Sequence, residues 1–158
     1  MYVSFNNGSK QKRELTESLS EYVASKIMPR LNQKIFIHFE FVRNLVKDES
    51  VYGDCMYIDD DIRLHREFLI RLDSGITMQR LLLTVAHEMV HVKQYARNEL
   101  CSVYKMGKIR FKNKYFSFNT IYWDTPWEIE AHGREQGLYI QWLERNKLTK
   151  RKWVNNEH

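Results

Sequence analysis

The stretch "TVAHEMVHVKQ", residues 84–94, holds His87, Glu88 and His91 in the order His-Glu-x-x-His. Side chains four residues apart lie on one face of an α-helix, so the two imidazoles would point the same way. Zinc accepts the neutral nitrogen of imidazole as a ligand. Glu88 would lie beside the metal without ligating it, where it could take a proton from a metal-bound water. The stretch therefore predicts a zinc-binding helix with Glu88 as catalytic base.

The surroundings of this motif favour a real site over a chance arrangement. Residues 77–97 carry an apolar stripe with the spacing of a buried helix face, made of Leu82, Val85, Ala86 and Met89. Thr77 is well placed to cap the helix at its N-terminus. The motif lies in the middle of this helix, on the face away from the stripe. Two histidines and a glutamate in so apolar a neighbourhood favour a binding role.

In one class of His-Glu-x-x-His enzymes, a Gly and a ligand His follow the motif after a few residues. Both are missing here, so a third zinc ligand must come from further along the chain. The acidic and histidine candidates are Glu99, Asp124, Glu128, Glu130, His132 and Glu135. On a helix over 126–146, Glu128, His132 and Glu135 share one face, whereas Glu130 points elsewhere. We prefer Glu128 as the ligand. His132 is expected to be either a ligand or a hydrogen-bond partner of one.

The remaining pattern predicts an α+β fold. Helices are expected at 12–28, 77–97 and 126–146, strands at 34–42, 53–59 and 65–73, and a hairpin or irregular excursion at 101–118. This order predicts a small mixed sheet packed against the motif helix and the C-terminal helix. Because the chain has 158 residues and no linker-like segment, residues 1–158 are expected to form one domain.

Two segments, "LLLTVAHEMVHVKQY" and "YWDTPWEIEAHGRE", together resemble short metallopeptidase-like proteins that bacteriophages often encode. These are similar to minimal gluzincins, and the resemblance covers residues 77–140. It implies a zincin-like fold in which His87, His91 and Glu128 bind Zn²⁺ and Glu88 is the general base. In thermolysin-like members an acidic residue one turn after the ligand glutamate orients a zinc-bound histidine. Here His132 holds that place, which departs from the pattern.

We therefore expect a zinc-dependent metallopeptidase that hydrolyses peptide bonds by Glu88-assisted attack of zinc-bound water. The expected substrate is a peptide or protein. The alternative is a zinc-stabilised interaction protein, weakly catalytic or inactive, that binds a host protein or nucleic acid. The presence of Glu88 favours the enzyme, because a structural zinc site needs no general base.

Further expectations concern the substrate cleft. The strand at 65–73 either borders the cleft and pairs with a bound peptide or is an ordinary sheet strand. The donors considered for a developing oxyanion are Tyr95, Tyr122, Tyr139 and Arg134. The aromatic residues Tyr122, Trp123 and Trp127 are expected in the core rather than in a pocket.

Composition adds few constraints on partners and location. The formal net charge of +5 permits an acidic partner without requiring one. The basic residues at 145–152 are typical of a solvated helix end, and no aromatic-and-basic signature of nucleic-acid binding is recognised. The sequence contains no apolar run of about 18 residues, so no transmembrane helix is expected. The N-terminus lacks a signal-peptide pattern, which predicts a cytoplasmic protein, in the host cytoplasm if phage-encoded. Cys55 and Cys101 are expected to be free thiols.

Overall fold

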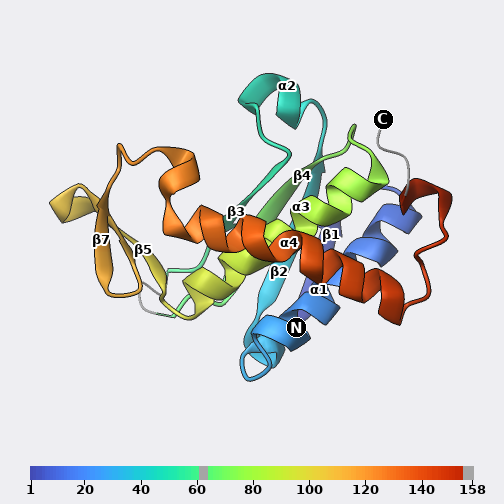
Figure 1. The fold of residues 1–158 in the computed structure, drawn as a ribbon, viewed down its shortest axis with the longest axis horizontal. Helices are drawn as coiled ribbons and strands as arrows, with labels where there is room; N and C mark the ends of the chain where they lie inside the picture. The colour runs from blue at the N-terminus through green and yellow to red at the C-terminus, as the bar shows by residue number, and fades with distance from the viewer. Residues whose placement is uncertain (61–63, 155–158) are drawn as a thin grey trace.

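The computed structural model describes residues 1–60 and 64–154, and its main layer is a four-stranded sheet (Figure 1). Its strands are β1 (Tyr2–Asn6), β2 (Phe36–Val42), β3 (Gly53–Tyr57) and β4 (Glu67–Asp73). The spatial order is β1-β2-β4-β3. β1, β2 and β4 run parallel, and β3 pairs antiparallel with β4 at the edge. The sheet is therefore small and mixed, as predicted.

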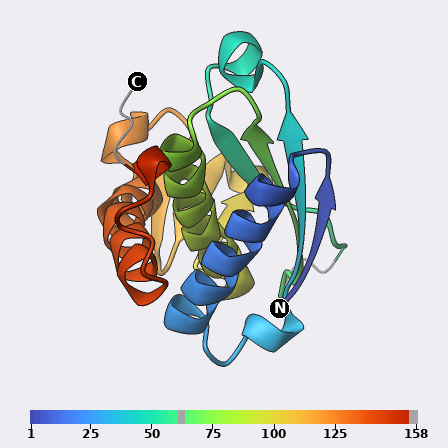
Figure 2. The ribbon, with the colours of Figure 1, turned by 90° about the vertical axis from the view of Figure 1, so that its right-hand side faces the viewer.

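α1 (Lys10–Ile27) and α3 (Met78–Ala96) cover one face of this sheet (Figure 2). The short α2 (Leu45–Glu49) lies beyond one end of the sheet, and α4 (Pro126–Arg145) is the C-terminal helix (Figure 1). Figure 2 shows α1 and α3 side by side against the sheet, with α4 lying further out. α4 packs chiefly on α3. The sequence predicted that the C-terminal helix packs on the sheet, but α3 lies between α4 and the sheet. Within the described residues, no helix is both long and apolar enough to cross a bilayer.

α3 begins and buries its apolar stripe as its sequence predicts. The Thr77 hydroxyl oxygen accepts a hydrogen bond from the backbone N–H of Arg80 at 3.3 Å, which caps the helix. The stripe residues Leu82, Val85, Ala86 and Met89 are completely buried. The opposite face of α3 is buried as well, because α4 lies over it. This second covered face is where the motif lies.

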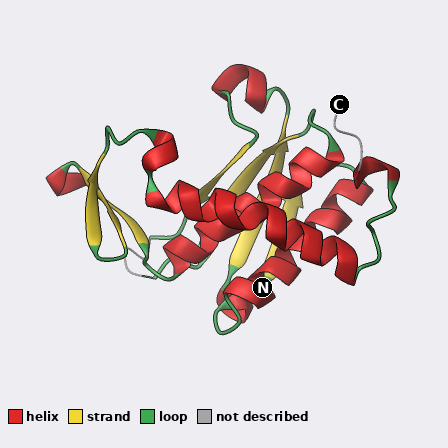
Figure 3. Ribbon diagram, viewed as in Figure 1, coloured by secondary structure: helices red, strands yellow, loops and turns green. Residues whose placement is uncertain are grey.

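Three elements were not predicted as they occur (Figure 3). β1 and α2 were missed, and both have only five residues. The segment read as a hairpin or excursion forms a separate three-stranded antiparallel sheet, made of β5 (Leu100–Val103), β6 (Lys108–Phe111) and β7 (Lys114–Ser117). β1 alternates exposed and half-buried residues, which is a weak signal until its pairing with β2 gives it a partner.

The strand before the motif helix does not border the cleft. β4 pairs with β2 on one side and β3 on the other, so its backbone groups are already used. Of the two readings, the ordinary sheet strand is the one observed. The strand at this edge of the sheet is β3, which pairs with β4 on one side only, and β1 lies at the opposite edge. Cys55, on β3, and Cys101 are both free thiols.

Gly53 lets β3 approach α3 closely. A Cβ at this position would lie 2.7 Å from both the Arg71 carbonyl oxygen and the Thr84 Cγ2. Gly53→Ala is therefore expected to lower the free energy of unfolding by about 1–3 kcal/mol, the usual effect of overpacking. Gly133→Ala is the matched control, because a Cβ there meets nothing within 4 Å and alanine favours a helix over glycine. Urea unfolding curves of both variants measure the difference; equal stability of both would contradict the close packing.

Candidate metal centre

Three side chains from α3 and α4 bring their ligand atoms together. His87 Nε2 lies 3.1 Å from His91 Nε2 and 3.2 Å from one carboxylate oxygen of Glu128. The other Glu128 oxygen lies 3.4 Å from His91 Nε2. Ligands bonded to tetrahedral zinc at about 2.0–2.1 Å are separated from one another by about 3.3 Å. The three predicted ligands therefore have the mutual spacing that a zinc ion requires.

Each histidine is oriented through its other ring nitrogen. His87 Nδ1 donates to Glu135 Oε2 at 2.7 Å, since a carboxylate can only accept. His91 Nδ1 lies 2.8 Å from the amide oxygen of Gln94. With both Nδ1 atoms protonated, the two Nε2 atoms carry free lone pairs. Two such lone pairs 3.1 Å apart repel each other unless a proton or a metal cation lies between them.

The orientation of the Gln94 amide is settled by its neighbours. Its nitrogen donates to the Trp127 carbonyl oxygen and to Glu130 Oε2, both at 3.0 Å. The amide oxygen is therefore the atom that faces His91, and it can only accept. Glu130 points away from the ligand atoms, as predicted, yet it supports His91 through Gln94. Partners of this kind keep a ligand in the correct tautomer and direction.

The electrostatics of the cluster favour a positive charge between the ligands. Burial alone would lower the pKa of His87, but its contacts with Glu128 and Glu135 outweigh burial and raise that pKa to about 10. Burial likewise opposes ionisation of Glu128, and the contacts with both histidines hold its pKa well below the usual range. The same field that would retain a proton here also attracts a divalent cation. The donor set, two imidazoles and one carboxylate, is one that zinc prefers.

Glu88 lies beside the three ligands and is not one of them. Its side chain is buried and lines a cavity of about 240 Å³ together with His87, His91 and Glu128. Among the described residues, it forms no ion pair with either histidine, unlike Glu128. Burial raises the pKa of Glu88, which makes its carboxylate a better proton acceptor than an exposed one. Its position matches the one predicted for a base.

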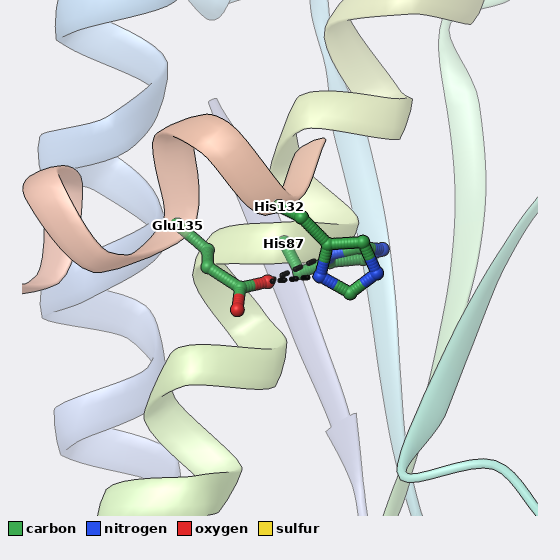
Figure 4. A group of neighbouring side chains, drawn as sticks. All are labelled: His87, His132 and Glu135. Carbon is green, nitrogen blue, oxygen red and sulfur yellow. Dashed lines mark hydrogen bonds and ion pairs between the residues drawn. The ribbon is translucent and has the colours of Figure 1, made fainter. Parts of the chain in front are cut away.

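His132 lies beside His87 and Glu135, as Figure 4 shows. Its Nδ1 is 3.4 Å from Glu135 Oε2, and its ring centre is 4.5 Å from that of His87. Its Nε2 is 3.2 Å from the Tyr122 hydroxyl. His132, His87 and Glu135 have ligand atoms close enough to form a second metal-binding group. However, Glu135 occupies the Nδ1 side of His87, whereas the Nε2 side faces Glu128 and His91, so we assign His132 to the surroundings of the ligands.

Glu135 contacts His87 Nδ1 and so can orient this ring. The resemblance placed such an acidic residue at position 132, one turn after Glu128. Glu135 lies seven residues after Glu128, and two helical turns return a side chain to the same face. The shared face was visible in the sequence, but the partner of each residue on it was not. Which carboxylate meets His87 depends on how α4 crosses α3, and this crossing is a tertiary property.

Of the four candidate oxyanion donors, Tyr122 and Tyr95 line the cavity, whereas Tyr139 and Arg134 do not. The Tyr122 hydroxyl donates to Glu128 Oε2 at 2.7 Å, and Tyr95 lines the same cavity. Tyr139 is buried in the main core, where burial raises its pKa to about 12, and Arg134 pairs with Glu130.

Of the aromatic residues before and within α4 that were predicted in the core rather than in a pocket, only Trp127 lies in a core, and it also lines the cavity beside Glu128. This side chain packs in a small cluster with Leu100 and Phe111. Tyr122 and Trp123 are instead exposed. They precede α4 in a short 3₁₀ turn, Tyr122–Asp124, in which Tyr122 contacts the predicted ligand Glu128.

Loss of the Glu135 contact should weaken zinc binding without removing a ligand. Glu135→Ala is expected to reduce zinc affinity by about 10- to 100-fold, as is typical for partners of ligating histidines. Glu128→Ala, which removes a ligand, should reduce it further. Competition with a chromophoric chelator measures both affinities. Equal affinity of Glu135→Ala and the unaltered protein would show that His87 needs no such partner.

Comparisons with protein-family models, with curated proteins and with solved structures give no match to this chain.

Proposed function

We propose that this protein is a zinc-dependent metallopeptidase with a zincin-like fold. One observation carries the proposal: Nε2 of His87, Nε2 of His91 and the Glu128 carboxylate converge at zinc-ligand spacing, with the buried, non-ligating Glu88 beside them. A purely structural site has no use for that fourth side chain. Bound zinc would act as a Lewis acid and lower the pKa of water to about 7.

The protein's own residues would carry the proton through the reaction. Glu88 would accept a proton from the attacking water as its oxygen bonds to the peptide carbonyl carbon. The carbon–nitrogen bond then breaks, and Glu88 delivers the proton to the leaving amine nitrogen. Glu135 and Gln94 would keep both imidazoles aligned throughout, because each holds an Nδ1.

An extended peptide is the substrate shape that suits this site. The cavity with the motif residues is lined on one side by Gly53, Asp54 and Cys55 of the edge strand β3. A second hollow, of about 790 Å³, is lined by Tyr52, Thr77, Arg80 and Glu135. Tyr52 immediately precedes β3, and Glu135 contacts His87, so the two hollows adjoin. A peptide added along β3 would pass from one to the other.

Tyr122 is the donor we favour for the developing oxyanion. Its hydroxyl lines the cavity, and its single proton, which is donated to Glu128 in this structure, would turn to the oxyanion during the reaction. Tyr95 reaches the same cavity from α3 but is only partly exposed. A preorganised donor of this kind stabilises the transition state more than the ground state.

The test combines metal content with cleavage. Protein purified without added metal is analysed for zinc and then incubated with a mixture of unstructured peptides, with cleavage read by mass spectrometry. We expect one zinc per chain, cleavage that stops with a chelator, and recovery when zinc is restored.

The alternative, a zinc-stabilised interaction protein, predicts zinc without cleavage of any peptide in the mixture. Absence of zinc, even after its addition, would contradict both functions. Zinc content therefore tests metal binding, and peptide cleavage tests the peptidase activity, within one experiment.

A further inference from the structure

The net positive charge of the protein coincides with one projecting segment. Residues 100–123, here called the basic lobe, contain no Asp or Glu and carry five basic residues: Lys105, Lys108, Arg110, Lys112 and Lys114. The formal net charge of the whole chain is also +5, so the remaining residues balance to zero. The lobe consists of β5, β6, β7 and their flanking turns, and it extends from one end of the molecule (Figure 1).

The charges of the basic lobe are available to a partner. Its four lysines are exposed. Within the described part of the chain, none of them forms an ion pair with a carboxylate. Arg110 is held in place instead, because its guanidinium donates to Asn98 and to the Lys112 carbonyl oxygen. Five cations without local counterions would attract a polyanion strongly.

Aromatic rings are exposed among these cations. Tyr104, Tyr115, Phe118 and Trp123 have exposed fractions of 77%, 52%, 48% and 67%. They lie outside the small core of the lobe, where Phe111 and Trp127 pack together. So many exposed rings on one short segment are unusual for a surface that faces only water.

The two faces of the small sheet have different roles. Ile109, Phe111 and Phe116 pack toward Trp127. Because side chains alternate along a strand, Arg110 and Tyr115 lie on the other face, where they are direct partners in the register of β6 and β7. The outward face thus places a cation beside an aromatic ring.

We propose that the basic lobe binds single-stranded nucleic acid. Cations that follow a phosphate backbone, combined with exposed rings on which bases stack, form the usual surface for such strands. A membrane-binding surface would instead present an amphipathic helix with an apolar face, whereas the lobe is built from short strands. The cations and rings of the lobe are already close together in the sequence, but their exposure is a property of the folded structure.

The experiment measures binding of a fluorescein-labelled 20-nucleotide oligo(dT) by fluorescence anisotropy. The lobe variant combines Lys108→Glu with Lys114→Glu. The control combines Lys147→Glu with Lys150→Glu, at exposed positions near the opposite end of the molecule (Figure 1). Both pairs change the formal net charge from +5 to +1. We expect the lobe variant to bind at least tenfold more weakly and the control to bind within twofold of the unaltered protein.

Two further readouts test the mechanism. Tyr115→Ala should weaken binding about fivefold or more if a base stacks on this ring. The logarithm of the affinity should fall with the logarithm of salt concentration with a slope of about −3, which corresponds to roughly four phosphate contacts. Glu88→Gln should bind the oligonucleotide normally, so failure of the peptidase proposal would leave this one intact.

Three results would overturn the proposal: no oligonucleotide binding by the unaltered protein, equal loss of affinity in the lobe and control variants, or unchanged affinity of Tyr115→Ala. Sedimentation with phosphatidylserine vesicles gives the competing outcome. Vesicle binding without oligonucleotide binding would assign the lobe to a membrane surface instead. The side chains substituted in the lobe, in its control and at Tyr115 are exposed, whereas Glu88 is buried, and circular dichroism checks that each variant is folded.

Discussion

Glu88→Gln should reduce peptide hydrolysis by about 10²- to 10⁴-fold, the usual contribution of a general base. The substitution keeps the shape of the side chain but removes its ability to accept a proton. Zinc content should remain unchanged, because Glu88 is separate from the three converging ligand atoms. Initial rates on a cleaved peptide and elemental analysis of the same preparation measure the two effects.

Glu144→Gln is the matched control for this experiment. Glu144 is exposed on α4, away from the cavity, so its substitution should leave the rate unchanged. If Glu88→Gln retained more than a tenth of the activity, the base would have to be another group. Loss of zinc together with activity would instead show that Glu88 supports the metal.

Lys93→Ala should lower the free energy of unfolding by about 3–5 kcal/mol, because it leaves two largely buried carboxylates without their cation. Lys93 is 4% exposed, and its ammonium lies 2.7 Å from both Glu99 and Glu130. These contacts join α3 to the start of β5 and to α4. Urea unfolding followed by tryptophan fluorescence, with a chelator present, measures the loss without a contribution from zinc.

The control for Lys93→Ala removes the charge of both partners in the Lys93–Glu130 ion pair. Lys93→Met combined with Glu130→Gln replaces much of the ion pair, so it should be less destabilising than Lys93→Ala alone. A loss below about 1 kcal/mol for Lys93→Ala would show that water solvates Glu99 and Glu130 adequately, as at surface ion pairs. Because Glu130 also holds Gln94, Lys93→Ala should weaken zinc binding as well.

The motif helix could be predicted in detail because its signals are local. The apolar stripe, the Thr77 cap and the four-residue spacing of His87 and His91 all depend on the geometry of one helix. Helix geometry likewise placed Glu128, His132 and Glu135 on one face of the last helix, but the preference for Glu128 among them is not decided by one helix alone. The structure brings the predicted ligands His87, His91 and Glu128 to within 3.4 Å of one another.

Other features of the site depend on packing between elements. The edge position of β3, the contact of Glu135 with His87 and the exposure of Trp123 follow from how strands pair and how α4 crosses α3. None of these relations is encoded in the spacing along one segment. A short strand such as β1 likewise becomes stable only with its partner, β2.

The sequence by itself determined which residues could bind zinc and which carboxylate could act as a base, because the chemistry of side chains and the period of a helix are local properties. Only the tertiary structure decided which groups orient those ligands, which strand borders the cavity and which side chains of the basic lobe are exposed. The physical reason is that hydrogen bonds, burial and surface charge arise between segments distant in the chain, and their energies exist only once those segments meet.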